Sequence, residues 1–186
     1  MKIKMGLQEL AQYTYQGLKR EGIEVTLSGG ACVSIYTDNA FQSGDLDFIR
    51  QGTDSIERVS TAMTAMGFKN HGRHFTHPDS ELFVEFPRPP LTVGEETPKS
   101  VLEYPITSRL GRIKVRMLSP TDCIKDRLCG FYYWNDLQSL DQAVMVAKHK
   151  RVDGKEIERW SKAERMSEKH AIFKEALAKK RKKNSE

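Results

Sequence analysis

The chain has few cysteines and no long apolar run. Its three cysteines, Cys32, Cys123 and Cys129, are an odd number without C-x-x-C spacing, which argues against a disulfide framework and a zinc knuckle. No apolar stretch approaches the roughly 18 residues needed to cross a bilayer, and the first residues, MKIKMGLQEL, lack the apolar segment of a signal peptide. We therefore expect a cytoplasmic protein that does not span a membrane.

The net positive charge lies at one end of the sequence. From Lys169 to Glu186 there are seven Lys or Arg residues and two Glu, which accounts for the whole formal charge of +5. With 38% hydrophobic and 30% charged residues, the 186-residue chain has the composition of a globular protein. The basic end either adds nonspecific affinity for RNA or is simply a solvated segment.

The hydrophobic pattern predicts strands and helices in a definite order. The first part reads as a helix over 7–22, a strand over 23–28 that ends in a glycine pair, a short helix over 31–36, a strand over 45–50 and a helix over 54–66. Asp54 is a plausible N-cap of the last helix. Hairpins are expected over 74–86 and 104–118, and helices from Pro120 onward, interrupted near 132–135 and 152–154. This order predicts an α+β fold with a mixed or antiparallel sheet, followed by a helical region.

Three features suited to phosphate and metal chemistry occur in succession. Gly29-Gly30 ends a strand, where the missing side chains let backbone N–H groups approach a phosphate, although such pairs also serve as plain turns. Asp45 and Asp47 lie on one face of the next strand, as Mg²⁺ ligands would, or as the solvated edge of an amphipathic strand. Glu85 sits within the apolar segment LFVEF, where burial is costly unless a cation is near, the alternative being a wet sheet face.

In combination these motifs resemble the nucleotidyltransferase superfamily, and in particular bacterial nucleotidyltransferase-like proteins related to abortive-infection and toxin–antitoxin transferases. The segments that carry the resemblance are LSGGACVSIY, SGDLDFI, VEFPRPPLTVG and LSPTDCIKDRLCGFYYWNDLQSLDQAVMVA. They span roughly Ile23 to Ala147. The resemblance implies the fold of DNA polymerase beta-like nucleotidyltransferases, with a catalytic core over 1–118, a helical region over 119–168 and a basic, mobile tail over 169–186.

The resemblance also implies an activity and assigns roles to residues. The enzyme would transfer a nucleoside monophosphate from an NTP to a hydroxyl of RNA, protein or a small molecule, releasing pyrophosphate. Asp45, Asp47 and Glu85 would be catalytic and would bind one or two Mg²⁺ ions. Nucleotide binding would fall to Ser28, Gly29, Gly30, Lys125 and Arg127, with Lys125 the first candidate for the phosphates and local ion pairing at helical spacing the alternative.

Two other functions remain open from the sequence. One is a nucleotidyltransferase-fold protein that binds nucleotide or a toxin or antitoxin partner without turnover. The other is an RNA-binding adaptor that acts through the basic tail. The aromatic cluster Phe131-Tyr132-Tyr133-Trp134 either stacks a nucleobase or packs between helices.

Overall fold

The structure is a computed structural model that describes residues 4–182. Within these residues a seven-stranded mixed sheet has the order β3-β4-β5-β2-β1-β7-β6. Its strands are β1 (Val25–Ser28), β2 (Asp45–Arg50), β3 (Lys69–Asn70), β4 (His74–Thr76), β5 (Phe83–Glu85), β6 (Val101–Ser108) and β7 (Gly111–Leu118). The predicted mixed sheet and both predicted hairpins are confirmed. The two-residue strand β3 was not predicted.

Strand β2 lies at the centre of the sheet between two partners that run in different directions. It pairs with β1 in antiparallel fashion, so that Asp47 lies opposite Ser28. On its other side it pairs with β5 in parallel, so that Asp47 also lies opposite Glu85. This register brings the glycine turn after β1 and the acidic end of β5 to either side of the same aspartate.

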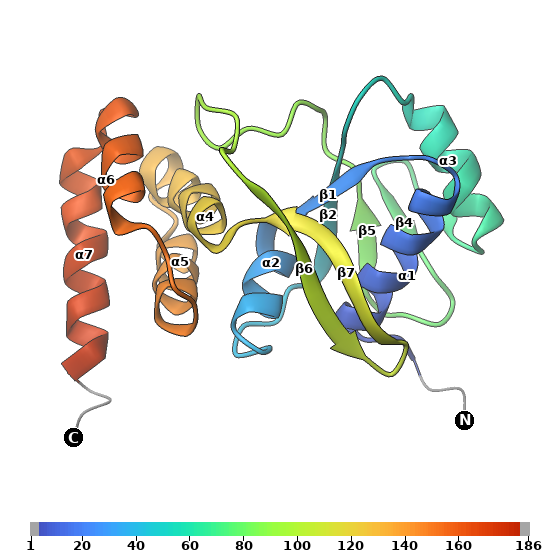
Figure 1. The fold of residues 1–186 in the computed structure, drawn as a ribbon, viewed down its shortest axis with the longest axis horizontal. Helices are drawn as coiled ribbons and strands as arrows, with labels where there is room; N and C mark the ends of the chain where they lie inside the picture. The colour runs from blue at the N-terminus through green and yellow to red at the C-terminus, as the bar shows by residue number, and fades with distance from the viewer. Residues whose placement is uncertain (1–3, 183–186) are drawn as a thin grey trace.

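Seven helices surround the sheet or follow it within the described residues. They are α1 (Leu7–Arg20), α2 (Gly29–Tyr36), α3 (Ile56–Ala65), α4 (Pro120–Trp134), α5 (Leu137–His149), α6 (Gly154–Ala163) and α7 (Ser167–Lys182). Helices α1 and α3 pack against each other on one side of the sheet, whereas α2 contacts β2 and also reaches α4 and α5 (Figure 1). Helix α2 therefore connects the sheet to the helical part of the chain.

Capping residues fix the ends of the helices next to the site. Ser119 accepts a hydrogen bond from the backbone N–H of Asp122 and precedes Pro120, the residue at which α4 begins, as predicted. Helix α4 ends at Trp134 and is capped by Asn135, which has a left-handed conformation. The predicted cap of α3 was one residue early: Ser55 accepts from the backbone of Arg58, while the side chain of Asp54 pairs with the guanidinium of Arg58.

The long segment 86–100 between β5 and β6 lies against the helical part of the chain. The indole N–H of Trp160 on α6 donates to the carbonyl oxygen of Val93 at 3.1 Å. Two ion pairs add to this contact, Arg159 with Glu96 at 2.6 Å and Lys99 with Glu156 at 2.9 Å. These contacts attach α6 to the segment that leaves the acidic end of β5.

Helix α7 covers the first part of the segment that we predicted as a basic tail. His170 and Phe173 on this helix are buried. Residues 183–186 lie outside the described residues, and the division of the chain into core, helical region and tail stays a prediction. No helix in the described part of the chain is both long and apolar enough to cross a membrane.

Candidate active site

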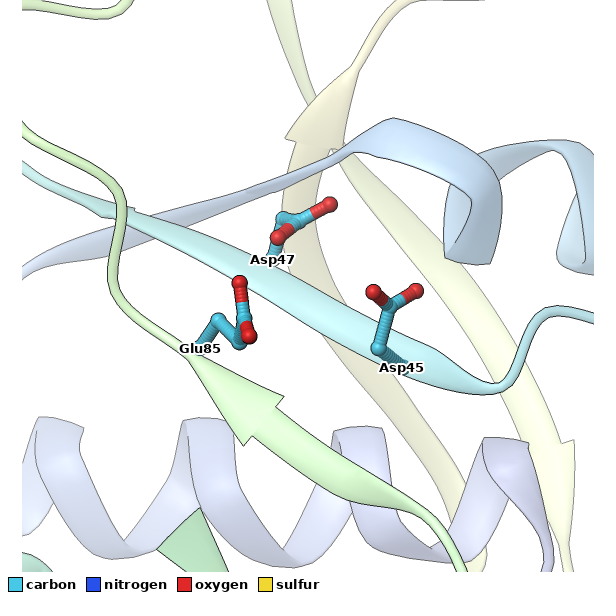
Figure 2. Close-up of side chains that lie close together, drawn as sticks. All are labelled: Asp45, Asp47 and Glu85. Carbon is cyan, nitrogen blue, oxygen red and sulfur yellow. The ribbon is translucent and has the colours of Figure 1, made fainter. Parts of the chain in front are cut away.

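Three carboxylates from two neighbouring strands converge at the centre of the sheet. Asp45, Asp47 and Glu85 each offer an oxygen atom, and these oxygens lie within 4.8 Å of one another. Figure 2 shows Asp45 and Asp47 on β2 and Glu85 at the end of β5, with all three side chains on one face of the sheet. Leu46 and Phe48 are fully buried on the opposite face, as the period-two pattern predicts.

The three like charges perturb each other most at the middle residue. Burial, together with the charges of Asp45 and Glu85, raises the pKa of Asp47 to about 7. Among the described residues, no lysine, arginine or histidine forms an ion pair with any of the three acids. A half-buried acidic group without a protein cation matches the hard oxygen donor set that Mg²⁺ prefers, so these residues fit a divalent metal.

The glycine pair makes room for the acids. A β-carbon on Gly29 would lie 2.3 Å from Oδ2 of Asp47, and the φ of Gly29 is +69°. A β-carbon on Gly30 would lie 2.7 Å from Oγ of Ser43. Both residues also begin helix α2, whose first N–H groups have no intrahelical acceptor and whose positive end lies beside the acids. The turn thus brings backbone donors beside the three carboxylates, an arrangement that suits a metal-bound phosphate.

Ser43 is a site residue that the sequence analysis missed. Its hydroxyl donates to Oδ1 of Asp45 at 3.0 Å, and its own N–H donates to Oγ of Ser34 on α2 at 2.9 Å. The loop before β2 is therefore fastened to α2, and through it the carboxylate of Asp45 is oriented. The sequence signal was the serine two positions before the first acid, within SGDLDFI.

The fold and the site can now be compared with known proteins. No family model matches the sequence, and no curated protein sequence matches it. Solved structures do match. The solution structure of the antibiotic-resistance factor ANT(2'')-Ia aligns with a TM-score of 0.56 over 91% of this chain and 95% of that chain, at 11% identity. A crystal structure of ANT(2'')-Ia with adenylyl-2''-tobramycin gives a TM-score of 0.54 over 85% and 96%, also at 11% identity.

A third match is a crystal structure of an antigenic nucleotidyltransferase-like protein from Paracoccidioides brasiliensis. It aligns with a TM-score of 0.56 over 77% of this chain and 76% of that chain, at 11% identity. The chain has the nucleotidyltransferase fold. The predicted fold class is confirmed, and with it the resemblance to nucleotidyltransferases at the level of the fold.

In this nucleotidyltransferase fold the two basic residues predicted to bind phosphates occupy different surroundings. Lys125 is only 2% exposed, and its ammonium lies 2.8 Å from Glu156 and 3.2 Å from Asp122. Arg127 is partly exposed and pairs with Asp126 at 2.6 Å. Asp126 raises the pKa of Asp47 and Arg127 lowers it, which places this part of α4 near the acids. Of the two residues, Arg127 has the better access to a ligand.

The aromatic cluster divides between core and surface. Phe131 and Tyr132 are buried, and Tyr132 stacks on Trp160 with ring centroids 5.5 Å apart. Tyr133 and Trp134 are 43% and 76% exposed. Both line a cavity of about 590 Å³ together with Arg127, Asp126 and the segment around Gly94. Packing between helices thus describes Phe131 and Tyr132, whereas stacking of a nucleobase stays a prediction for Tyr133 and Trp134.

Proposed function

We propose that the chain is a Mg²⁺-dependent nucleotidyltransferase that moves a nucleoside monophosphate from an NTP to a hydroxyl acceptor and releases pyrophosphate. The observation that carries this proposal is the group of Asp45, Asp47 and Glu85 oxygens within 4.8 Å of one another, in a nucleotidyltransferase fold. The glycine turn at the start of α2 supports it, because this turn supplies phosphate-binding N–H groups next to the same acids.

The acids and the glycine turn have separate tasks in this reaction. Asp45, Asp47 and Glu85 would hold the metal, which when bound neutralises charge on the phosphates and favours loss of the acceptor's proton. Ser43 keeps Asp45 oriented through its 3.0 Å hydrogen bond. The backbone of Ser28, Gly29 and Gly30 would bind the phosphates. In-line displacement at the α-phosphorus leaves the protein with positioning and charge neutralisation as its main tasks.

Helix α4 would hold the rest of the nucleotide. Arg127 presents a guanidinium to the cavity, where its planar donors suit phosphate oxygens. Tyr133 and Trp134 line the same cavity, and exposed rings of this kind stack nucleobases. Lys125 was proposed for the same task, but its ammonium is already bonded to two carboxylates. We therefore assign the phosphate contact to Arg127 first.

The activity is tested by label transfer. The protein is incubated with each α-labelled NTP, Mg²⁺ and pools of cellular RNA, protein and small molecules, including an aminoglycoside such as tobramycin, because a solved ANT(2'')-Ia structure contains adenylyl-2''-tobramycin. The variant Asp45→Ala/Asp47→Ala is compared with Glu81→Gln, an exposed acid whose ion pair is with Lys4. We expect transfer by the wild type and Glu81→Gln, and none by the double variant.

Two outcomes would change the proposal. Label transfer that survives in Asp45→Ala/Asp47→Ala would contradict the metal assignment. Mg²⁺-dependent nucleotide binding by the wild type, with no transfer to any acceptor pool, would favour the function without turnover, in which the protein binds nucleotide or a toxin or antitoxin partner.

A further inference from the structure

A second cavity, of about 530 Å³, borders the acidic group from the side of β5. Glu85 contributes to its wall, and so do three arginines, Arg50, Arg73 and Arg88. The arginines come from the end of β2, the turn between β3 and β4, and the segment that follows β5. Three segments distant in sequence thus deliver guanidinium groups to one hollow beside a proposed metal ligand.

The arginines of this cavity are mostly without protein partners. Among the described residues, neither Arg73 nor Arg88 has an ion pair or a side-chain hydrogen bond. Arg50 donates from Nη1 to the carbonyl oxygen of Asp54 at 2.5 Å, but its buried Nε has no acceptor. The residues that line the cavity include three guanidinium groups and one carboxylate, that of Glu85. The cavity has a net positive charge and unused donors.

The position of the cavity relative to the sheet separates it from the glycine turn. Across the sheet the order is Glu85 on β5, Asp47 on β2 and Ser28 on β1. The glycine turn and α2 follow β1, whereas Glu85 lies on the other side of Asp47 and contributes to the wall of the arginine cavity, to which Arg50 comes from the end of β2. In-line phosphoryl transfer requires the attacking and leaving oxygens on opposite sides of the phosphorus. If the NTP phosphates bind at the glycine turn, the attacking hydroxyl arrives from the side of Glu85.

We propose that the cavity of Arg50, Arg73 and Arg88 binds a phosphate group of the acceptor, so that the acceptor is a phosphate-bearing molecule whose hydroxyl reaches the metal site beside Glu85. This inference rests on the proposed nucleotidyl transfer. Guanidinium groups bind phosphate oxygens through paired N–H donors, and a cavity of this volume accommodates a sugar phosphate or the terminal nucleotide of a strand. The same phosphate chemistry is offered by a small phosphorylated metabolite and by a nucleic acid end.

The test measures acceptor binding separately from turnover. The nucleotide site is first saturated with Mg²⁺ and a non-hydrolysable ATP analogue, and the protein is then titrated with ribose 5-phosphate or with a short oligoadenylate that ends in a free 3′-hydroxyl. The variant Arg73→Gln/Arg88→Gln keeps Arg50, whose Nη1 holds the backbone before α3. Arg112→Gln, an exposed arginine at the start of β7, removes a positive charge elsewhere. Circular dichroism checks that all variants fold.

We expect the double variant to lose roughly tenfold or more in affinity for a phosphate-bearing probe and to show a shallower salt dependence, while Arg112→Gln binds as the wild type does. Much tighter binding of the oligoadenylate than of ribose 5-phosphate would identify a nucleic acid acceptor, and similar binding a small phosphorylated one. Unchanged affinity in the double variant would overturn the proposal. So would a loss confined to Mg²⁺–nucleotide binding. If the wild type binds Mg²⁺ and nucleotide but neither phosphate-bearing probe, this inference is refuted and the proposed nucleotidyl transfer still stands.

Discussion

Gly29 and Asp47 approach each other so closely that a β-carbon on Gly29 would lie 2.3 Å from Oδ2 of Asp47. The backbone of Gly29 also has a φ of +69°, a conformation that L-residues with a side chain rarely adopt. Two independent constraints therefore require glycine at this position. The first is the positive φ of the turn that starts α2. The second is the close approach of the Asp47 carboxylate, which we assign to the metal.

The first prediction concerns Gly29→Ala. The methyl group would displace Asp47 and strain the backbone by about 1–2 kcal/mol, so we expect a thermal midpoint several degrees lower and a weakened affinity for Mg²⁺. Gly44→Ala is the matched control, because a β-carbon there meets nothing within 4 Å and Gly44 also lies next to an acid of the site. Thermal unfolding and Mg²⁺ titration measure both effects. Equal behaviour of the two variants would contradict the steric role of Gly29.

The second prediction concerns pH. The pKa of Asp47 is raised to about 7 in the folded protein, above its ordinary value of about 4 in an unfolded chain. The folded state therefore binds the proton more tightly, and without metal its stability falls as the pH rises from about 4 to about 7. Asp47→Asn removes this loss. At about pH 8 without metal we expect the variant to be more stable than the wild type by on the order of 2 kcal/mol.

The difference between Asp47→Asn and the wild type should nearly disappear below about pH 3, where Asp47 is mostly protonated in both the folded and the unfolded state. At about pH 8, Mg²⁺ should raise the urea concentration at the unfolding midpoint of the wild type but not that of the variant. Urea unfolding at several pH values, with and without Mg²⁺, measures these changes. If the stabilities of the two proteins change with pH in parallel, ionisation of Asp47 does not destabilise the folded protein.

The third prediction separates Lys125 from Arg127. Lys125→Met leaves Asp122 and Glu156 without their buried cation, a loss of about 3–5 kcal/mol, so the thermal midpoint should fall strongly while the affinity of the remaining folded protein for nucleotide stays nearly unchanged. Arg127→Gln should do the reverse, with roughly tenfold weaker binding of Mg²⁺–ATP and a smaller change in stability. If Lys125→Met instead abolishes nucleotide binding without destabilising the protein, Lys125 binds the phosphates.

Much of this site was predictable because its signals are local. The strand Asp45–Arg50 has the bounds that the DLDFIR pattern predicts, and the glycine pair does follow β1, although the helix that was predicted from residue 31 already begins at Gly29. Residues two apart on a strand share a face, so the position of Asp45 and Asp47 on the same face follows from their spacing alone. Glu85 was anticipated because an acid in an apolar strand needs a compensating partner.

The missed features depend on contacts between distant segments. The arginines at 50, 73 and 88 have no common sequence pattern, and only the pairing of β5 with β2 and β4 brings them to one cavity. Lys125 occupies an ordinary helical position in the sequence. It is buried, and its ammonium donates to Glu156 on α6, 31 residues further along the chain. Helix and strand propensity and hydrophobic periodicity describe neighbours within one element, so neither predicts contacts between distant segments.

The fourth prediction uses the two tryptophans as reporters. Trp134 is 76% exposed at the cavity that contains Arg127, whereas Trp160 is fully buried and bonded to Val93. If the nucleobase stacks at this cavity, adding nucleotide should quench the fluorescence of Trp134 and leave that of Trp160 unchanged. Trp134→Phe should lose the quenching yet bind with similar affinity, because a ring remains, and Trp134→Ala should bind more weakly by about 1–3 kcal/mol. Quenching that persists in Trp134→Phe would show that the base does not stack on Trp134. Full affinity in Trp134→Ala would show the same.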